Sequence, residues 1–334
     1  QTKIFEMHTT PGGVCTAWKR KGYTIDGAVN WVVGTKPDGM YHRFWEELGA
    51  AQQWKVHNHT RTQVAENSAG RQLTFYCDAN RLERHLLEIA PEDSKVIREL
   101  TGAIRRAAKF SFPADKPEEL YGPLDKLKMI RMLPMMGFMK KWSGVSAGDF
   151  SKRFSNPFLK EVIPMTFGTD LPMLMLILLL ALQHSTSAGY LIGGALPLVE
   201  SIEKRYLDLG GEVHYGARVD KILVEHDRAV GVRLVDGREH RSDWVVSAAD
   251  GRTTIFDMLE GRYTDRAIEE QYEHPHLFQP LVYVSLGVAR KLDDLPESIG
   301  GLFYPLSKPI PNAGKEERTI CVRSYSFDPT LAPA

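Results

Sequence analysis

The chain has 334 residues, of which 43% are hydrophobic and 25% charged, which is enough for a substantial core in one or two domains. Its 42 basic and 42 acidic residues give a formal net charge of zero, so no nucleic-acid partner is expected. Cys15, Cys77 and Cys321 have neither C-x-x-C nor metal-ligand spacing. The sequence therefore predicts a reducing, cytoplasmic location rather than a secreted one.

A short strand that ends in an acid opens the chain. Residues 3–6 read KIFE, and the paired glycines Gly12 and Gly13 follow Glu6. In a dinucleotide-binding fold, a carboxylate at the tip of the second strand accepts hydrogen bonds from ribose hydroxyls. Glycines beyond it let the backbone approach a pyrophosphate. Because Pro-Gly-Gly is usually only a turn, this segment alone does not separate a nucleotide site from an ordinary loop.

Residues 35–187 are predicted to begin a second sheet and to continue into helices. A helix is expected at residues 37–48, and Asp78 is expected to cap another one. Strands are expected at residues 54–58, 62–66 and 71–77. His57 and His85 lack metal-ligand spacing, so we interpret both as surface or satisfied polar residues and expect no metal site.

Two apolar stretches follow. Residues 124–142 combine methionines, which adapt to irregular apolar surfaces, with basic side chains that can reach lipid phosphates. They fit either a peripheral membrane contact or a Met-rich core helix with a solvated edge. Residues 171–182 are twelve apolar residues in a row, short of the ~20 that span a bilayer. This stretch predicts a helix that is buried on nearly all sides or lines an apolar cavity.

Residues 190–250 predict a helix, a strand, an antiparallel meander and a buried strand, in that order. Helical spacing is carried by Leu198, Ile202, Tyr206 and Leu209. Asp236-Gly237 is a tight hairpin signal within the meander. The apolar run at residues 244–249 favours a strand buried on both faces of a parallel sheet. Further strands are expected at residues 277–288 and 319–327.

A meander inserted between two strands of a doubly wound sheet, an acid followed by paired glycines, and the G-Y-T-I-D element at residues 22–26 occur together in this chain. The combination resembles the phytoene desaturase and carotenoid isomerase-related group of the flavin amine oxidase superfamily. The resemblance implies an α/β fold in which an FAD-binding Rossmann-like domain, residues 1–34 and 188–258, is interleaved with a mixed-sheet α+β substrate domain. That second domain would comprise residues 35–187 and 259–334 and carry a helical cap.

The same resemblance implies an adenosine-binding half of the FAD site. Glu6 would hold the adenosine ribose, and Gly12 and Gly13 would let the backbone approach the pyrophosphate. Val219, at the start of the meander, corresponds to the position whose backbone contacts adenine. The cofactor expected is therefore FAD.

Three further residues are implied to lie near the flavin or the substrate. Gly193 and Gly194 would sit where the chain passes the flavin or a substrate tunnel, although a simple helix-entry turn explains them equally well. Trp31 belongs to the segment at residues 27–34 that resembles the flavin-lining part of the superfamily, and ordinary core packing is its alternative. No catalytic acid or base can be assigned.

The implied activity is hydride transfer between FAD and a long apolar polyene or isoprenoid lipid, as in carotenoid desaturases, isomerases and saturases. In such enzymes the flavin carries the chemistry and the protein supplies binding and orientation. Two alternatives remain: a flavin amine oxidase, or a non-catalytic prenyl-lipid-binding protein of the GDP-dissociation-inhibitor type. The G-x-G-x-x-G turn that opens the family does not occur at the start of this chain, so we expect an internal piece of a longer flavoprotein.

Overall fold

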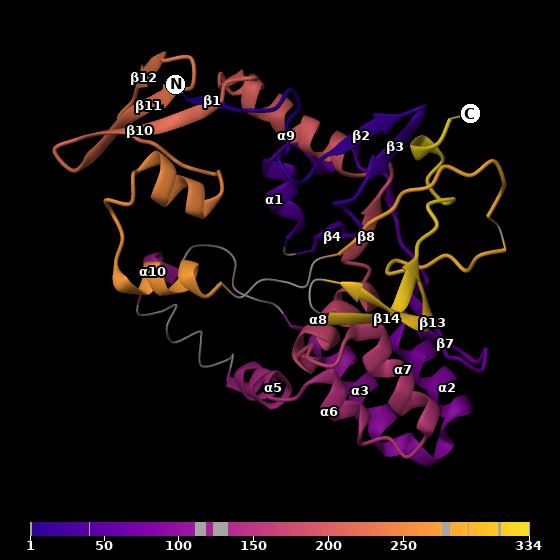
Figure 1. Cartoon of the computed structure of the whole chain (residues 1–334). Helices are drawn as coiled ribbons and strands as arrows, with labels where there is room; N and C mark the ends of the chain where they lie inside the picture. The colour runs from indigo at the N-terminus through magenta and orange to yellow at the C-terminus, as the bar shows by residue number, and fades with distance from the viewer. Residues whose placement is uncertain are drawn as a thin grey trace. The chain divides into compact units, whose positions relative to one another are not determined.

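The structure is a computed structural model that describes residues 2–39, 41–110, 118–122, 133–275, 281–292, 294–312 and 315–333. The chain forms two compact units. Unit 1 consists of Gln1–Thr16 and Val199–Tyr283, and unit 2 consists of Ala17–Leu198 and Val284–Ala334. Helices and strands are mixed along the chain (Figure 1), which confirms the predicted α/β class. The predicted domain boundaries remain a prediction.

Unit 1 contains a parallel strand pair and an antiparallel meander. Strand β1 (Lys3–Phe5) pairs in parallel with β9 (Glu212–His214), and β9 follows helix α9 (Ala195–Asp208). The meander comprises β10 (Val219–Glu225), β11 (Arg228–Leu234) and β12 (Glu239–Arg241). The π-helix η5 (Thr253–Met258) and α10 (Arg266–Glu273) follow. The predicted helix, strand and meander are therefore confirmed.

The expected buried strand at residues 244–249 is wrong. These residues form no strand, and Trp244 and Val246 are 84% and 91% exposed. A strand that is buried on both faces needs hydrogen-bonded neighbours and cover on each side. Among the described strands, the parallel sheet contains only β1 and β9, so nothing pairs with this run. An apolar run alone does not specify a strand.

The main sheet of unit 2 has four strands in the order β14-β13-β6-β7. Its members are β6 (Arg61–Glu66), β7 (Gln72–Tyr76), β13 (Leu302–Asn312) and β14 (Lys315–Val322). Strand β13 runs parallel to β6, and the other pairs are antiparallel. The mixed second sheet is therefore confirmed, although β14 ends before residue 327.

Two smaller sheets complete the strands of unit 2. Strands β2 (Ala17–Arg20) and β3 (Tyr23–Asp26) form a hairpin. Strand β8 (Ala188–Leu191) lies between β4 (Val32–Val33) and β5 (Val56–His57). Because β8 directly precedes Gly193 and Gly194, this small sheet positions the predicted glycine turn.

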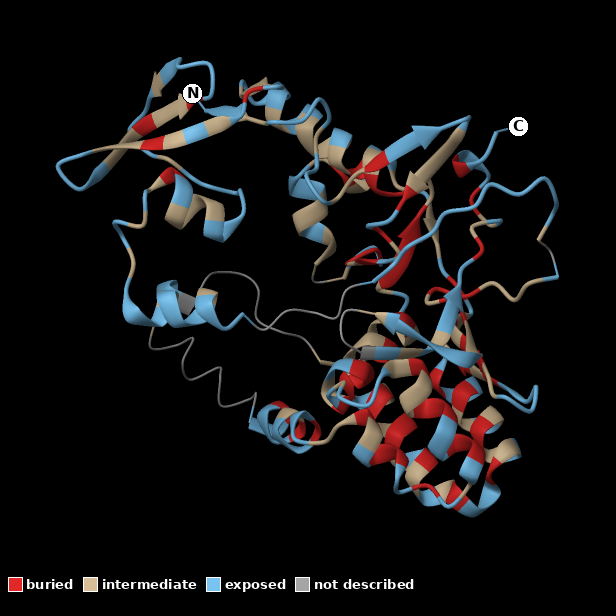
Figure 2. Cartoon of the chain, viewed as in Figure 1, coloured by how far each residue is buried: buried red, intermediate tan, exposed pale blue. Residues whose placement is uncertain are grey.

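The helices of unit 2 form its main core together with β6 and β7. They are α2 (Ala79–Ile89), α3 (Ser94–Ala107), α5 (Leu133–Ser143), α6 (Ala147–Ser151), α7 (Pro157–Phe167) and α8 (Met173–His184). Figure 2 shows that buried residues concentrate on these helices. Helix α8 packs against α2, α3 and α5. Half of its apolar side chains are buried, but Met175 is 57% exposed, so the helix is less enclosed than its sequence predicts. None of the described helices is long and apolar enough to cross a membrane.

The remaining helices are short, and two predicted elements differ from the structure. The short helices are α1 (His42–Glu47), η1 (Ala51–Gln53), η2 (Pro91–Asp93), η3 (Glu118–Leu120) and η6 (Pro329–Leu331). Helix α1 covers only half of the stretch predicted at residues 37–48. The strand expected at residues 277–288 is wrong for residues 281–288, which have exposed side chains and form no strand; residues 276–280 lie outside the described part. Residues 123–132 of the Met-rich stretch also lie outside it.

Candidate functional site

Glu6 lies immediately after β1, at the carboxyl end of the parallel pair. Its N–H donates to the His214 carbonyl at 2.9 Å, and its own carbonyl accepts from Ala217 N–H at 2.9 Å. Its Oε1 accepts from His8 N–H at 2.8 Å. The half-buried carboxylate is therefore fixed at the sheet edge where dinucleotide folds bind ribose.

Gly12 and Gly13 form an exposed turn whose backbone requires glycine. Their φ angles are +107° and +57°, in the region that L-residues rarely adopt. The turn is closed by Cys15 N–H, which donates to the Gly12 carbonyl at 2.9 Å. A Cβ at Gly12 would lie 2.3 Å from the Cys15 oxygen, whereas one at Gly13 would meet nothing within 4 Å. The turn thus exposes backbone that no side chain covers, which would allow a phosphate group to approach it closely.

Val219, the first residue of β10, follows a turn that is attached to the Glu6 segment. Gly216 N–H donates to the His8 carbonyl at 3.0 Å, in addition to the bond from Ala217 to Glu6. The acid and the start of the meander therefore lie side by side within unit 1. These residues fit the adenosine end of FAD, because they combine an accessible carboxylate, a glycine turn and adjacent backbone.

Gly193 and Gly194 form a left-handed turn before α9, with φ angles of +98° and +73°. The Gly193 N–H donates to Asp328 Oδ2 at 2.8 Å, and the Ala195 N–H donates to Asp26 Oδ2. A Cβ at Gly194 would lie 2.2 Å from that Asp26 oxygen. The helix-entry turn is therefore real, and two buried acids hold it.

Asp26 and Asp328 hold the predicted glycine turn, and the sequence reasoning did not select either of them as a site residue. Both side chains are buried. Asp328 Oδ2 also accepts from the Tyr190 hydroxyl at 3.0 Å, and Asp26 Oδ1 accepts from the backbone of Ala28 at 2.9 Å. Burial, together with the Asp328 charge, raises the pKa of Tyr190 far above its usual value. The signal for Asp26 was its place in the G-Y-T-I-D element, whereas nothing near Asp328 in the sequence points to its contact with Gly193.

Trp31 lies directly before β4 and is exposed, which argues against the core-packing alternative. It belongs to unit 2 with Gly193 and Gly194, whereas Glu6, Gly12, Gly13 and Val219 belong to unit 1. The structure thus gathers the predicted adenosine-side residues in one unit and the predicted flavin-side residues in the other.

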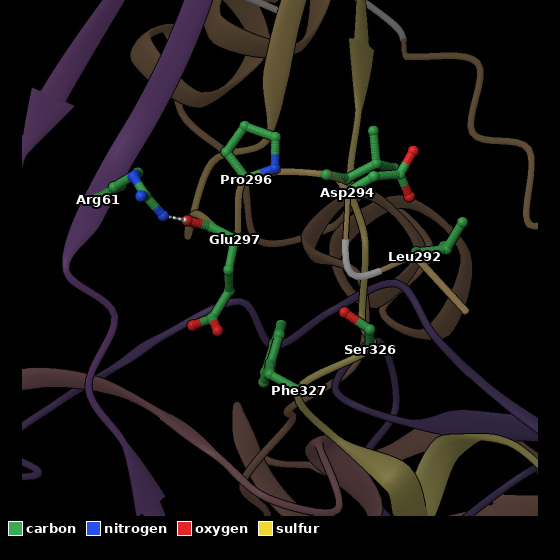
Figure 3. Close-up of a pocket in the computed structure, with 8 residues that line it drawn as sticks. Arg61, Leu292, Asp294, Pro296, Glu297, Ser326 and Phe327 are labelled. Carbon is green, nitrogen blue, oxygen red and sulfur yellow. Dashed lines mark hydrogen bonds between the residues drawn. The ribbon is translucent and has the colours of Figure 1, made fainter.

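A second group of polar residues in unit 2 surrounds Glu297. His57 Nε2 contacts Glu297 Oε1, and His59 Nδ1 lies 2.6 Å from the same oxygen. Glu297 also lines an open pocket of about 540 Å³. The pocket residues are Arg61, Leu292, Asp294, Leu295, Pro296, Glu297, Ser326 and Phe327 (Figure 3). His57 was predicted to be a surface or satisfied polar residue, and it is half-buried with Glu297 as its partner.

The electrostatics of this group follow from burial. Desolvation, followed by the neighbouring His57, lowers the pKa of His59 to about 4. Desolvation acts to raise the pKa of Glu297, but contacts with His57 and His59 outweigh it and hold that pKa below its usual value. His59 is therefore neutral and Glu297 ionised near pH 7. His85, by contrast, accepts from the Thr74 N–H at 3.3 Å, as a satisfied polar residue should.

Residues 1–330 match the sequence model of the family described as flavin containing amine oxidoreductase. The chain belongs to this family, which confirms the expected resemblance and its flavin cofactor.

Its curated relatives include carotenoid enzymes. Prolycopene isomerase, chloroplastic, of Arabidopsis thaliana is 23% identical over 330 residues, covering 88% of this chain and 50% of that protein. Phytoene desaturase (neurosporene-forming) of Rhodobacter capsulatus is 29% identical over 216 residues, covering 60% of this chain and 40% of that protein. The chain spans about half the length of the curated relatives it matches. Among solved structures, an oxidoreductase from Methanosarcina mazei is 17% identical with a TM-score of 0.49, covering 81% of this chain and 58% of that one.

Proposed function

We propose that this chain forms part of an FAD-dependent oxidoreductase that acts on CH–CH bonds of a long apolar polyene or isoprenoid lipid. The observation that carries the proposal is the Glu6 carboxylate, fixed at the carboxyl end of β1 beside the glycine turn. The family match supports the flavin, and the printed names of the relatives support the substrate class.

Each part of unit 1 has a role in this proposal. The Glu6 carboxylate would accept hydrogen bonds from the ribose hydroxyls. The turn at Gly12 and Gly13 would direct backbone toward the pyrophosphate, and the backbone of Val219 would contact adenine. When bound, FAD would supply hydride transfer. The side chains described would bind and orient the cofactor, and none is assigned as an acid or base.

The side chains of helix α5 support an apolar ligand that enters from a lipid surface. On α5, Met135 and Phe138 are buried, whereas Leu133 and Met136 are 58% and 54% exposed. Lys140 is also exposed on this helix. Exposed apolar side chains with nearby lysines suit a peripheral contact with anionic lipids. Co-sedimentation with vesicles that contain phosphatidylserine tests this contact. Lys140→Glu should weaken binding to the vesicles, whereas Lys160→Glu on α7 should not. Equal binding by both variants would exclude α5 as the contact.

The cofactor is tested by the visible spectrum of a longer protein that contains this chain. Bands near ~370 and ~450 nm are expected from bound flavin. Glu6→Ala should weaken FAD binding by roughly 10- to 100-fold, because a hydrogen bond to a charged group contributes about 1.5–3 kcal/mol. Glu273→Ala, at an exposed carboxylate of α10, is the matched control. A colourless protein that stays colourless with added FAD would reject the enzyme and favour the prenyl-lipid-binding alternative.

A further inference from the structure

Two imidazoles converge on one carboxylate oxygen in unit 2. His57 ends β5, His59 follows two residues later, and Glu297 comes from the loop before β13, 240 residues from His57. The nitrogens His57 Nε2 and His59 Nδ1 both face Glu297 Oε1. The three potential ligand atoms lie within 4.8 Å of one another. Ligand atoms at about 2.0–2.2 Å from one metal ion lie at most about 4.4 Å apart, so the three atoms need only a small approach to share one cation.

The His59 ring leaves a polar atom unsatisfied. Its side chain is 2% exposed, and Nδ1 lies 2.6 Å from Glu297 Oε1 without the alignment of a hydrogen bond. A buried polar atom without a partner costs about 1–3 kcal/mol. A lone pair on Nδ1 would repel the carboxylate oxygen 2.6 Å away. A cation bound to both atoms removes the repulsion and satisfies the nitrogen.

Aromatic packing holds both imidazoles in place. The Phe327 ring stacks on His57 with centroids 4.9 Å apart, and it meets His59 edge-on at 4.6 Å. Tyr190 packs edge-on against Phe327 at 4.9 Å, and its hydroxyl is tied to Asp328. Glu297 is the more exposed partner, with a side chain that is 36% exposed. The site therefore combines two ring nitrogens that pack against an aromatic side chain with one oxygen on a partly exposed side chain.

We propose that His57, His59 and Glu297 form a mononuclear site for a divalent transition metal, with zinc the best fit. Two imidazole nitrogens and one carboxylate oxygen are ligands of borderline metals such as Zn²⁺. Zinc-to-ligand distances of about 2.0–2.2 Å at tetrahedral angles place neighbouring ligand atoms about 3.3 Å apart. To reach that spacing, the Glu297 oxygen would move out from between the two nitrogens by about 1 Å or less, and the nitrogens, which lie within 4.8 Å of one another, would close to about 3.3 Å. Glu297 and Phe327 also line the open pocket of Figure 3, so one of the three ligands borders solvent-accessible space.

Three protein ligands leave a fourth tetrahedral position for water or another donor. The competing explanation is a metal-free clamp, in which both imidazoles donate N–H groups to Glu297 and tie its loop to β5. The variant Glu297→Gln distinguishes the metal site from the metal-free clamp. The amide keeps a hydrogen-bond acceptor for the clamp but removes the anionic oxygen that the metal requires.

Titration of the tag-free, metal-stripped chain with Zn²⁺ alone tests the site. We expect one Zn²⁺ per chain, a rise in Tm with zinc, and visible bands of tetrahedral Co²⁺ when cobalt replaces it. Glu297→Gln and His57→Gln should each weaken zinc binding by at least roughly 100-fold, beyond the effect of losing a supporting residue. His85→Gln, at a half-buried histidine outside the cluster, should bind zinc like the wild type.

Two results would overturn the proposal. One is a wild-type chain that takes up no zinc while its circular dichroism shows it folded. The other is zinc binding that Glu297→Gln and His57→Gln leave unchanged, since the ion would then lie elsewhere. Because Glu297 is partly exposed, its amide variant is suited to remain folded, and an unchanged metal-free Tm would show that it does.

Discussion

At the scale of single residues, Asp328 connects three parts of unit 2 through one buried carboxylate. It accepts from the Tyr190 hydroxyl and Gly193 N–H on one oxygen, and from Thr330 on the other. We expect Asp328→Asn to lower the free energy of unfolding by about 2–4 kcal/mol, because an amide nitrogen must face one set of donors. Urea unfolding measures this loss.

The control for Asp328→Asn is Asp170→Asn, which removes the same charge at an exposed position. Its effect should stay within about 0.5 kcal/mol of the wild type. Equal losses in the two variants would mean that charge, rather than the buried acceptor, accounts for the effect.

Glu83 makes the stability of unit 2 depend on pH. Its Oε2 on α2 accepts from Thr101 Oγ1 at 2.6 Å and from Arg105 Nη2 at 2.7 Å on α3. The hydrogen bond from Thr101, and then Arg105, hold the pKa of Glu83 below its usual value. The unfolded chain therefore binds this proton at higher pH than the folded chain. The contribution of Glu83 is present above about pH 4.3 and is lost as pH falls through the folded pKa.

We expect Glu83→Gln to lower the free energy of unfolding at pH 7 by about 1–2 kcal/mol. The difference from the wild type should shrink as pH falls below about 4.3 and through the lowered pKa of the folded state, where the wild-type carboxylate becomes protonated. Glu88→Gln, at an exposed position of the same helix, should show no such change. Parallel pH curves for the wild type and Glu83→Gln would contradict the argument.

Local residue chemistry was predictable, but long-range partnerships were not. The sequence drew attention to Glu6 and both glycine pairs because each lies within a short, recognisable segment, and their roles at the cofactor stay predictions. Asp328 contacts Gly193 across 135 residues, and no local pattern encodes that contact. For the same reason, the sequence did not predict that Glu297 contacts the two histidines.

At the scale of elements, a glycine-to-alanine substitution should have opposite effects on stability in helix α3 and in the turn before α9. Gly102 lies inside α3, where a Cβ would meet nothing within 4 Å, so Gly102→Ala should stabilise the protein by about 0.5–1 kcal/mol. Gly194→Ala places a Cβ 2.2 Å from Asp26 Oδ2 at a φ of +73°. It should destabilise by at least about 2 kcal/mol. Thermal unfolding measures both, and a shared sign would refute the assignment of the turn.

Elements that are specified by residues within one short segment were predicted well. Asp78 caps α2 by accepting from Arg81 N–H at 2.7 Å, and the apolar run of α8 is a helix with one face in the core. Residues 244–249 and 281–288 were predicted as strands and are not strands in the structure. A strand depends on a partner elsewhere in the chain, whereas a helix makes its hydrogen bonds within itself.

At the scale of the whole molecule, the two units differ in how much apolar surface they bury. A cluster of 26 buried residues, all within residues 65–181, forms the core of unit 2. In the described part of unit 1, the buried hydrophobic residues are Ala217, Ile222, Leu234 and Met258. Since a fully buried large side chain contributes about 1.5–3 kcal/mol, unit 1 has the smaller reserve against unfolding.

We therefore expect unit 1 to open at a lower urea concentration than unit 2. Hydrogen exchange at increasing urea, read by mass spectrometry, should show β10 and β11 losing protection before α3 and α8. Ile222→Ala should move the first transition to lower urea, because it removes a core side chain of unit 1, and leave the second in place. Leu180→Ala in α8 is the matched change in unit 2 and should lower the second midpoint. Loss of protection in all four elements at one urea concentration would instead show that the two units unfold as one cooperative body.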